Sequence, residues 1–221
     1  MTKSTVLIAA LAAVGSAVAI KKTKIRLAGA GVEPAPEPAD IDFVRVKDYI
    51  PDIEVELMYA TDRNFTGKVI YDFTEAWLRY GTVKKLAEAQ EILKEQGYRL
   101  KIWDGFRPVS AQFKLWEAYP DAEFVADPRQ GFSAHSRGNA VDVTLVDMDG
   151  GYVEMPTAFD DFTEKAHRDY GWIEDPAVRE HVKLLEDTMA SCGFEPYASE
   201  WWHFSDLVSY PVGTAVEPSK E

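Results

Sequence analysis

The stretch Ser133-Ala134-His135-Ser136-Arg137-Gly138-Asn139-Ala140-Val141-Asp142, with Glu200-Trp201-Trp202-His203 further along the chain, carries the strongest signal in this sequence. Together they offer two imidazoles, one carboxylate, and a second carboxylate beside the last histidine. A catalytic zinc takes three nitrogen or oxygen ligands and keeps an open position for water, whose proton a neighbouring Glu can accept. The pattern therefore predicts Zn²⁺ held by His135, Asp142 and His203, with Glu200 as the base.

The segment around Asp142 reads as a strand. Its polar and apolar positions alternate, so that Ala140, Asp142 and Thr144 share one face. A carboxylate on a buried face is costly unless something pairs with it, and a metal does so well. Gly138 and Asn139 allow the chain to turn back, so that His135 can approach Asp142. Taken alone, the spacing His-x6-Asp is more typical of a surface loop with a solvated acid, and the third candidate ligand changes this balance.

Glu200 and His203 would point to opposite faces of a regular strand. Both can reach one site only if the chain turns or bulges, so a break is predicted near Glu200-Trp201. A histidine in an aromatic strand is more often a hydrogen-bonded core residue than a ligand. By spacing alone, Glu200 as an ordinary surface acid remains an equal alternative.

Arg107 lies in the turn Asp104-Gly105-Phe106-Arg107-Pro108, directly after a predicted strand. Its guanidinium is suited to stabilise an oxyanion that forms on an attacked carbonyl group. Asp104 is placed to orient it through a bidentate pair. From these residues alone, a surface salt bridge that caps the turn is an equally good interpretation of Arg107 and Asp104.

Composition narrows the class of protein. The 221 residues suit one catalytic domain, and a single cysteine, Cys192, excludes an intramolecular disulfide and a thiolate zinc cluster. Cys192 is expected to serve packing. The formal net charge of -13 repels phosphate backbones, so no nucleic-acid partner is expected.

The N-terminus indicates export. Lys3 precedes an apolar run over residues 6–20, which is short for a membrane span of about 20 residues and typical of a signal-peptide core. The basic cluster 21–26 is unusual after a cleaved signal, so an uncleaved anchor that tethers the chain to a membrane through residues 6–20 stays open. We expect residues 1–30 to be a signal peptide or signal anchor, and the protein to be periplasmic or otherwise extracytoplasmic.

The rest of the chain divides into three parts. A Pro/Ala/Glu linker over 31–40 precedes a catalytic domain over 41–212, and 213–221 reads as a flexible tail. Periodicity predicts helices over 77–96, 109–119 and 176–191, and strands over 99–103, 140–146 and 200–205. Their irregular interleaving predicts a single α+β domain, with a small, mostly antiparallel sheet flanked by helices.

Several of these motifs resemble those of one family. Ser-x-His-x6-Asp, Glu-Trp-Trp-His and Trp-Asp-Gly-Phe-Arg-Pro resemble the zinc D-alanyl-D-alanine dipeptidases, which include enzymes linked to vancomycin resistance and belong with the wider D,D-peptidase and hedgehog-like metallopeptidases. Residues 58–67 are similar to that family's Tyr-Ala-Thr-x-x-Asn-Phe-Thr-Gly segment. Residues 155–160 are similar to its Met-Gly-x-x-Phe-Asp loop, with Pro156 in place of Gly.

The resemblance implies a hedgehog-like fold and a role for each matching residue. It implies zinc ligands at His135, Asp142 and His203, the catalytic base at Glu200, and stabilisation of the transition state by Arg107. It also implies that three residues bind the termini of the dipeptide, namely Tyr59, Ser133 and Asp160. Asp160 is chemically suited to an ammonium group and Ser133 to a carboxylate.

The activity implied is zinc-dependent hydrolysis of D-Ala-D-Ala to two D-alanines in cell-wall peptide metabolism, with no stable protein partner. A D,D-carboxypeptidase that trims peptidoglycan stem peptides is the alternative, and it differs in leaving the amine side of the pocket open. Tyr59 and Asp160 favour the closed form. A non-catalytic wall-binding module would have lost Glu200 or a ligand, and none is missing.

Overall fold

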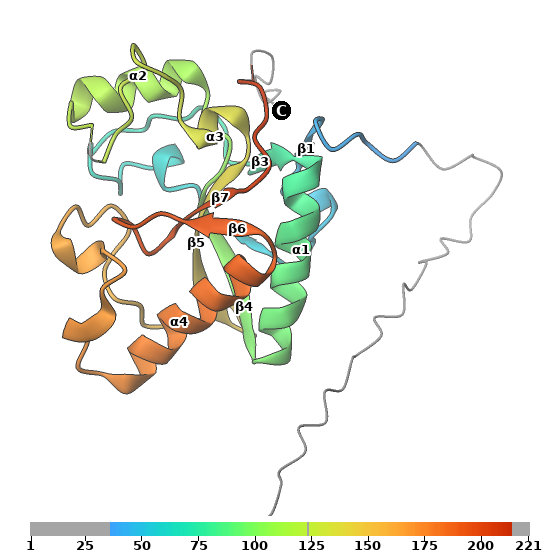
Figure 1. Cartoon of the computed structure of the whole chain (residues 1–221). Coiled ribbons are helices and arrows are strands. Elements are labelled where there is room, and N and C mark those ends of the chain that lie inside the picture. The colour runs from blue at the N-terminus through green and yellow to red at the C-terminus, as the bar shows by residue number, and fades with distance from the viewer. Residues whose placement is uncertain (1–35, 123, 214–221) are drawn as a thin grey trace, which may run out of the picture. The chain divides into compact units, whose positions relative to one another are not determined.

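The computed structural model describes residues 36–122 and 124–213 (Figure 1). Its centre is a five-stranded sheet in the order β2-β4-β5-β7-β6, in which β2 and β4 are parallel and the other neighbours are antiparallel. The strands are β2 (Glu54–Val55), β4 (Tyr98–Asp104), β5 (Ala140–Asp147), β6 (Phe194–Pro196) and β7 (His203–Asp206). A separate antiparallel pair joins β1 (Phe43–Arg45) to β3 (Trp77–Arg79). The predicted α+β class and mostly antiparallel sheet are confirmed.

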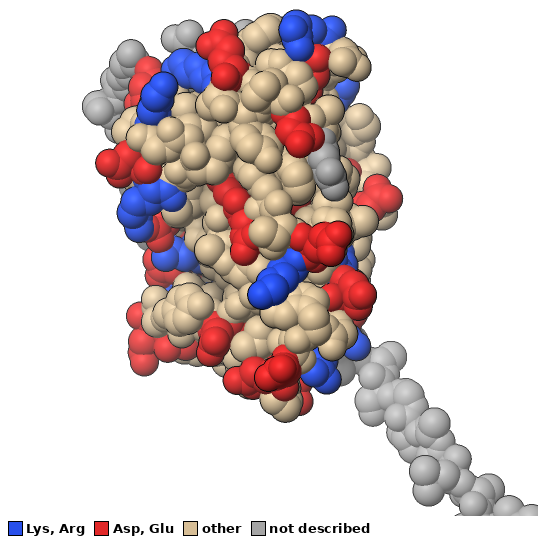
Figure 2. Space-filling view, turned by 90° about the vertical axis from the view of Figure 1, so that its left-hand side faces the viewer, with Lys and Arg blue, Asp and Glu red and all other residues tan. Residues whose placement is uncertain are grey.

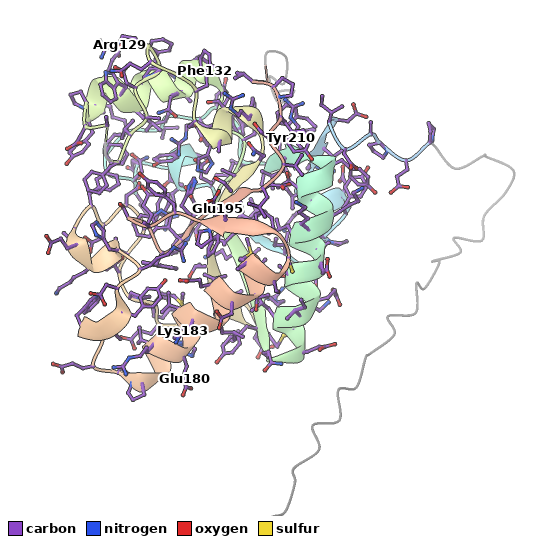
Figure 3. All side chains as sticks on the ribbon, in the orientation of Figure 1. Arg129, Phe132, Glu180, Lys183, Glu195 and Tyr210 are labelled. Atoms are coloured by element: carbon purple, nitrogen blue, oxygen red, sulfur yellow. The ribbon has the colours of Figure 1, made fainter. Side chains whose placement is uncertain are left out.

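Two long helices pack on the sheet, while two shorter ones lie beyond its end (Figure 1). The helices are α1 (Tyr80–Glu95), α2 (Val109–Ala118), α3 (Ala134–Arg137) and α4 (Pro176–Ser191). Short 3-10 turns occur at η1 (Val46–Asp48), η2 (Met58–Ala60), η3 (Glu164–Ala166) and η4 (Tyr170–Trp172). The apolar stripes of α1 and α4 that the sequence predicts are buried, and each such aliphatic side chain stabilises the fold by about 1.5–3 kcal/mol. Glu180 and Lys183 lie on the exposed side of α4 (Figure 3).

The ends of the helices follow local signals. The side chain of Asp175 accepts a hydrogen bond from the backbone N–H of Ala177, which starts α4 at Pro176 as predicted. Gly97, with φ +86°, follows the end of α1. The start of α1 was predicted wrongly at residue 77, because Trp77–Arg79 pairs with β1 and the helix begins only at Tyr80.

A β-bulge at Trp103 shapes the end of β4 next to the candidate metal ligands. The register of β4 and β5 pairs Ile102 with Val143 and then Asp104 with Asp142, so Trp103 is the extra residue. In an unbroken ladder Asp104 would lie opposite Val141 and point to the other face. The bulge therefore brings the buried carboxylates of Asp104 and Asp142 to the same face.

The last strand also begins later than predicted. Glu200–Trp202 form a turn, and β7 starts at His203, so the expected strand over 200–205 is wrong at its start while the expected break near Glu200 is confirmed. The signal segment 1–30, half of the linker and nearly all of the tail lie outside the described residues. Within the described residues, no helix is long and apolar enough to cross a membrane. On the face shown in Figure 2, acidic and basic side chains are interspersed.

Candidate metal centre and active site

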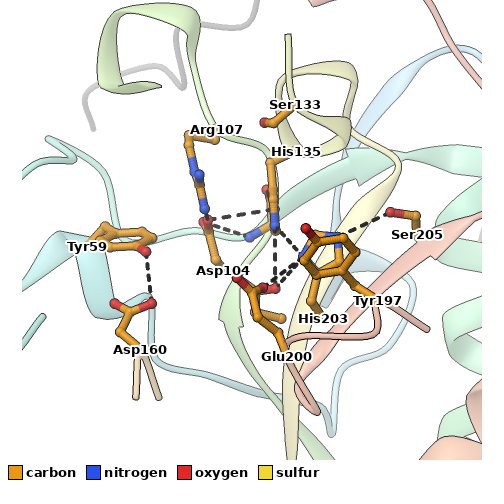
Figure 4. Close-up of polar contacts among 12 residues, drawn as sticks. Tyr59, Asp104, Arg107, Ser133, His135, Asp160, Tyr197, Glu200, His203 and Ser205 are labelled. Atoms are coloured by element: carbon orange, nitrogen blue, oxygen red, sulfur yellow. Dashed lines mark hydrogen bonds and ion pairs between the residues drawn. The ribbon is translucent and has the colours of Figure 1, made fainter. Parts of the chain in front are cut away.

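Three side chains meet at one end of the sheet, as the sequence predicts (Figure 4). His135, Asp142 and His203 each present one ligand atom, and these atoms all lie within 4.8 Å of one another. His135 Nε2 is 3.1 Å from His203 Nδ1 and 3.4 Å from Asp142 Oδ1, and His203 Nδ1 is 2.9 Å from Asp142 Oδ1. Ligands bound tetrahedrally to zinc at about 2.0–2.1 Å are about 3.3 Å apart. The donor set and its spacing therefore fit zinc.

Secondary structure places each of the three. Asp142 on β5 and His203 on β7 are directly paired across the ladder, so their side chains project from the same face. His135 comes from the short helix α3, after which Gly138 adopts a left-handed conformation with φ +77°. A Cβ at Gly138 would also collide with the ring of Phe43. This residue thus allows the reversal that brings His135 back over Asp142.

Hydrogen bonds set the tautomers of both histidines. Nδ1 of His135 is 2.8 Å from the carbonyl oxygen of Gly105, an acceptor, so Nδ1 donates and Nε2 faces the centre with its lone pair. Nε2 of His203 lies 3.2 Å from Ser205 Oγ, which leaves Nδ1 for the centre. Such outer partners orient metal-binding imidazoles. Ser205 was missed from the sequence, although its position two residues after His203 on a strand places both on one face.

Electrostatic interactions within the centre shift the pKa values of Asp142 and His135. Burial alone would raise the pKa of the Asp142 carboxyl, but the neighbouring His135 and His203 outweigh it and hold this pKa far below its usual range. Burial likewise opposes protonation of His135, yet the charge of Asp142 raises the pKa of that imidazole. A buried carboxylate that stays ionised beside two imidazoles is suited to binding a cation.

Glu200 lies beside this centre without joining it. Its Oε2 is 3.9 Å from His203 Nδ1, and its side chain is buried. Burial, the largest effect, raises the pKa of Glu200 to about 8. A bound divalent cation would favour the ionised form. Glu200 therefore has the position of a base next to a metal.

The turn that carries Glu200 is held from outside the centre. Arg168 donates to the carbonyl oxygens of Tyr197 at 2.8 Å and His203 at 2.9 Å, and so joins the two ends of the turn. Arg168 also forms an ion pair with Glu186 on α4 at 2.9 Å. This arginine was not singled out from the sequence, because nothing local marks a residue whose contacts lie 29 and 35 positions further along.

Arg107 is buried and lines the same cavity. Its Nε and Nη2 donate to one oxygen of Asp104 at 3.1 and 2.7 Å, so the pair forms, but on a single carboxylate oxygen instead of the expected two. The other oxygen accepts from the hydroxyl of Tyr71 at 2.7 Å, and Arg107 Nη1 donates to Gln112 at 3.0 Å. Burial disfavours its charge, but Asp104, Tyr71, Tyr59 and Asp142 together outweigh burial and raise the pKa of Arg107. The guanidinium is thus charged and fixed.

Tyr59 and Asp160 meet at one end of the cavity, where the Tyr59 hydroxyl donates to Asp160 Oδ1 at 3.1 Å (Figure 4). The second oxygen, Oδ2, is buried and has no hydrogen-bond partner among the described residues. Asp160 also has φ +58°, in the left-handed region. Burial, and then the charge of Asp142, raise the pKa of Asp160 well above its usual range. An unpaired, buried acceptor held in this conformation suits a cationic ligand.

Ser133 lines the cavity as well, and its hydroxyl accepts a hydrogen bond from the N–H of Ser136 at the start of α3. The structure therefore brings all eight predicted site residues together. The cavity has a volume of about 220 Å³, below the roughly 300–1,000 Å³ of sites for drug-sized ligands. Its walls also include residues that the sequence did not reveal, among them Phe124, Phe162, Tyr197 and Trp202.

Comparison with known proteins agrees with this geometry. The peptidase family described as D-ala-D-ala dipeptidase matches residues 39–210. The D-alanyl-D-alanine dipeptidase of Escherichia coli is 40% identical over 173 residues, covering 77% of this chain and 89% of that protein. The enzyme of the same name from Enterococcus faecium is 31% identical over 185 residues, covering 75% and 91%.

A solved structure of VanYB in complex with D-alanine-D-alanine is more distant, with a TM-score of 0.40 and 17% identity over 71% of this chain and 78% of that chain. The family match covers most of the described residues, including every residue of the centre. The chain belongs to the D-alanyl-D-alanine dipeptidase family of peptidases.

Proposed function

We propose that this protein is a zinc metallopeptidase that hydrolyses D-Ala-D-Ala to two D-alanines in cell-wall peptide metabolism. The observation that carries the proposal is the spacing of His135 Nε2, Asp142 Oδ1 and His203 Nδ1, with the carboxylate of Glu200 beside them. The family and the names of the curated relatives support the same substrate.

His135, Asp142 and His203 would hold the zinc. When bound, zinc supplies a Lewis acid that polarises the scissile carbonyl and lowers the pKa of water. Glu200 accepts a proton from the attacking water and then delivers it to the nitrogen of the leaving D-alanine. Arg168 keeps Glu200 within reach by fixing the turn.

Arg107 stabilises the negative charge that develops on the carbonyl oxygen. Its guanidinium cannot turn away, because Asp104 and Gln112 hold three of its nitrogens. A preorganised donor of this kind needs no rearrangement during the reaction. At the ends of the dipeptide, Asp160 and Tyr59 bind the ammonium group and Ser133 binds the carboxylate.

The test compares two substrates. Purified zinc-loaded protein is incubated in parallel with D-Ala-D-Ala and with a pentapeptide stem, and release of D-alanine is measured. We expect cleavage of the dipeptide and little of the pentapeptide, and no activity in a His203→Ala control. Equal rates on both would replace the dipeptidase with a D,D-carboxypeptidase, and absence of cleavage would refute both.

We also propose that the protein is exported and acts outside the cytoplasm, with residues 6–20 as a signal core or a membrane tether. The support is the basic residue followed by the short apolar run. Fractionation of cells that express the full chain or a chain lacking residues 1–30 tests this. Equal amounts of both forms in the cytoplasm would contradict it.

A further inference from the structure

A second, larger cavity lies behind the proposed substrate pocket. Its volume is about 550 Å³, within the roughly 300–1,000 Å³ typical of small-molecule sites. It extends over β4 and β5, where Lys101, Trp103 and Thr144 line it. Lys101 and Arg63 form ion pairs with Glu56 at its wall, so charges of both signs border it.

The two cavities lie on opposite sides of two chain segments, residues 58–59 and 159–160. Met58 and Phe159 line the second cavity, whereas their sequence neighbours Tyr59 and Asp160 line the first. Tyr59 and Asp160 are the residues proposed to bind the ammonium group. An amino-terminal extension of the dipeptide begins at that group, and the second cavity lies directly behind it.

The Phe159 ring packs between aromatic residues of the two cavities. The Phe159 ring lies 5.7 Å from the ring of Tyr59 and 5.7 Å from that of Trp202, both of which line the first cavity. On its other side it lies 5.3 Å from Trp103, in the second cavity. Centroid separations of about 4.5–7 Å are direct ring contacts, so no peptide can pass between these rings.

The loop that carries Phe159 is fixed. The indole N–H of Trp201 donates to Thr157 Oγ1 at 2.9 Å, which joins the loop to the turn that bears Glu200. Trp201 is fully buried and contacts Trp103, with ring centroids 5.7 Å apart. These contacts fix the loop and the Trp103 ring on which Phe159 packs.

From this arrangement, and resting on the proposed dipeptidase function, we infer that Phe159 determines peptide length. Its ring packs behind Tyr59 and Trp202 at the ammonium end of the pocket and blocks the way to the second cavity, which excludes peptides with a residue before D-Ala-D-Ala. Removal of the ring would give Tyr59 and Trp202 room to move apart and open a way to the second cavity for that extra residue. Phe159 is therefore a specificity residue, distinct from Asp160, which contacts the ammonium group itself.

The experiment measures binding separately from turnover. In a zinc-loaded Glu200→Gln background, dissociation constants for D-Ala-D-Ala and L-Ala-D-Ala-D-Ala are measured by calorimetry, with and without Phe159→Ala. We expect the ratio of the tripeptide constant to the dipeptide constant to fall at least about tenfold, as for the gain or loss of a small apolar group in a pocket. Tyr152→Ala is the matched control, because Tyr152 lines the second cavity and is highly exposed.

Phe159→Leu serves as a milder variant should the alanine variant fold poorly, and its ratio should fall in the same direction. An unchanged ratio in a folded, zinc-loaded variant, or a native protein that binds both peptides equally, would overturn the inference. Turnover with Glu200 restored gives a separate readout. Failure of the native protein to cleave D-Ala-D-Ala would refute the proposed function, whereas the binding ratio alone decides the role of Phe159.

Discussion

Replacement of Ser205 by alanine should weaken zinc binding without touching a ligand. The Ser205 hydroxyl accepts a hydrogen bond from Nε2–H of His203 at 3.2 Å, and so keeps Nδ1 of that ring unprotonated toward Asp142 and His135. Without this acceptor the imidazole can rotate or adopt the other tautomer. Rotation turns the lone pair of Nδ1 away from the metal, and the other tautomer places a proton on Nδ1.

The structure sets the size of the effect. Outer hydrogen-bond partners of metal ligands typically contribute about 10–100-fold in affinity. The contact of 3.2 Å is at the long end for a hydrogen bond, and the His203 side chain is 15% exposed, so water can replace part of the interaction. We therefore expect the lower end of the range, a roughly tenfold weaker zinc affinity, which equals about 1.4 kcal/mol.

Competition with a chromogenic chelator measures this affinity in the native protein, in Ser205→Ala and in Ser205→Thr. The threonine variant keeps the hydroxyl and should bind zinc nearly as the native protein does. If Ser205→Ala binds zinc within about twofold of the native protein, the hydrogen bond does not orient His203 and the reasoning fails.

Two further predictions concern the carboxylates. Glu200→Gln should keep stoichiometric zinc, measured by atomic absorption, while losing about 10²–10⁴ of the rate, the usual contribution of a general base; loss of zinc would instead make Glu200 a ligand. Asp160→Asn should stabilise the metal-free protein at neutral pH by about 1–3 kcal/mol, because it replaces a buried carboxylate, one oxygen of which has no partner, by a group that cannot ionise. An acid whose folded pKa is raised loses folding stability as pH rises from its unfolded pKa of about 3.9 toward the folded value, so the gain should vanish below about pH 4. Urea unfolding at pH 4 and pH 7 checks this, and equal gains at both would contradict it.

The metal centre was predictable because its signals are local. The alternation around Asp142 gave the face of β5, and the helical turn between Gly138 and His135 needs no distant partner. The break near Glu200 followed from requiring Glu200 and His203 to share a site. The burial and grouping of these side chains distinguish metal-site residues from surface acids, and only the folded structure shows them.

The supports of the centre were not predictable in the same way. Arg168 reaches the turn of Glu200 from a distant segment, and α1 starts late because β1 pairs with Trp77–Arg79. Gln112 did carry a signal, since it is a polar residue on the buried side of α2. Phe159 looked like an ordinary apolar residue, and its role depends on two cavities that no sequence pattern describes.

The bulge at Trp103 makes the centre depend on the register of β4 as well as on its residues. If the same residues paired without the bulge, Asp104 would lie opposite Val141 and turn to the other face of the sheet. Arg107 would then lose the carboxylate that holds it, although every side chain in the pocket would still be present in the chain. Substitution at a partly exposed position such as Lys101 does not alter this register. Changes near Trp103 that remove the bulge should therefore disable the pocket without replacing any of the residues that line it.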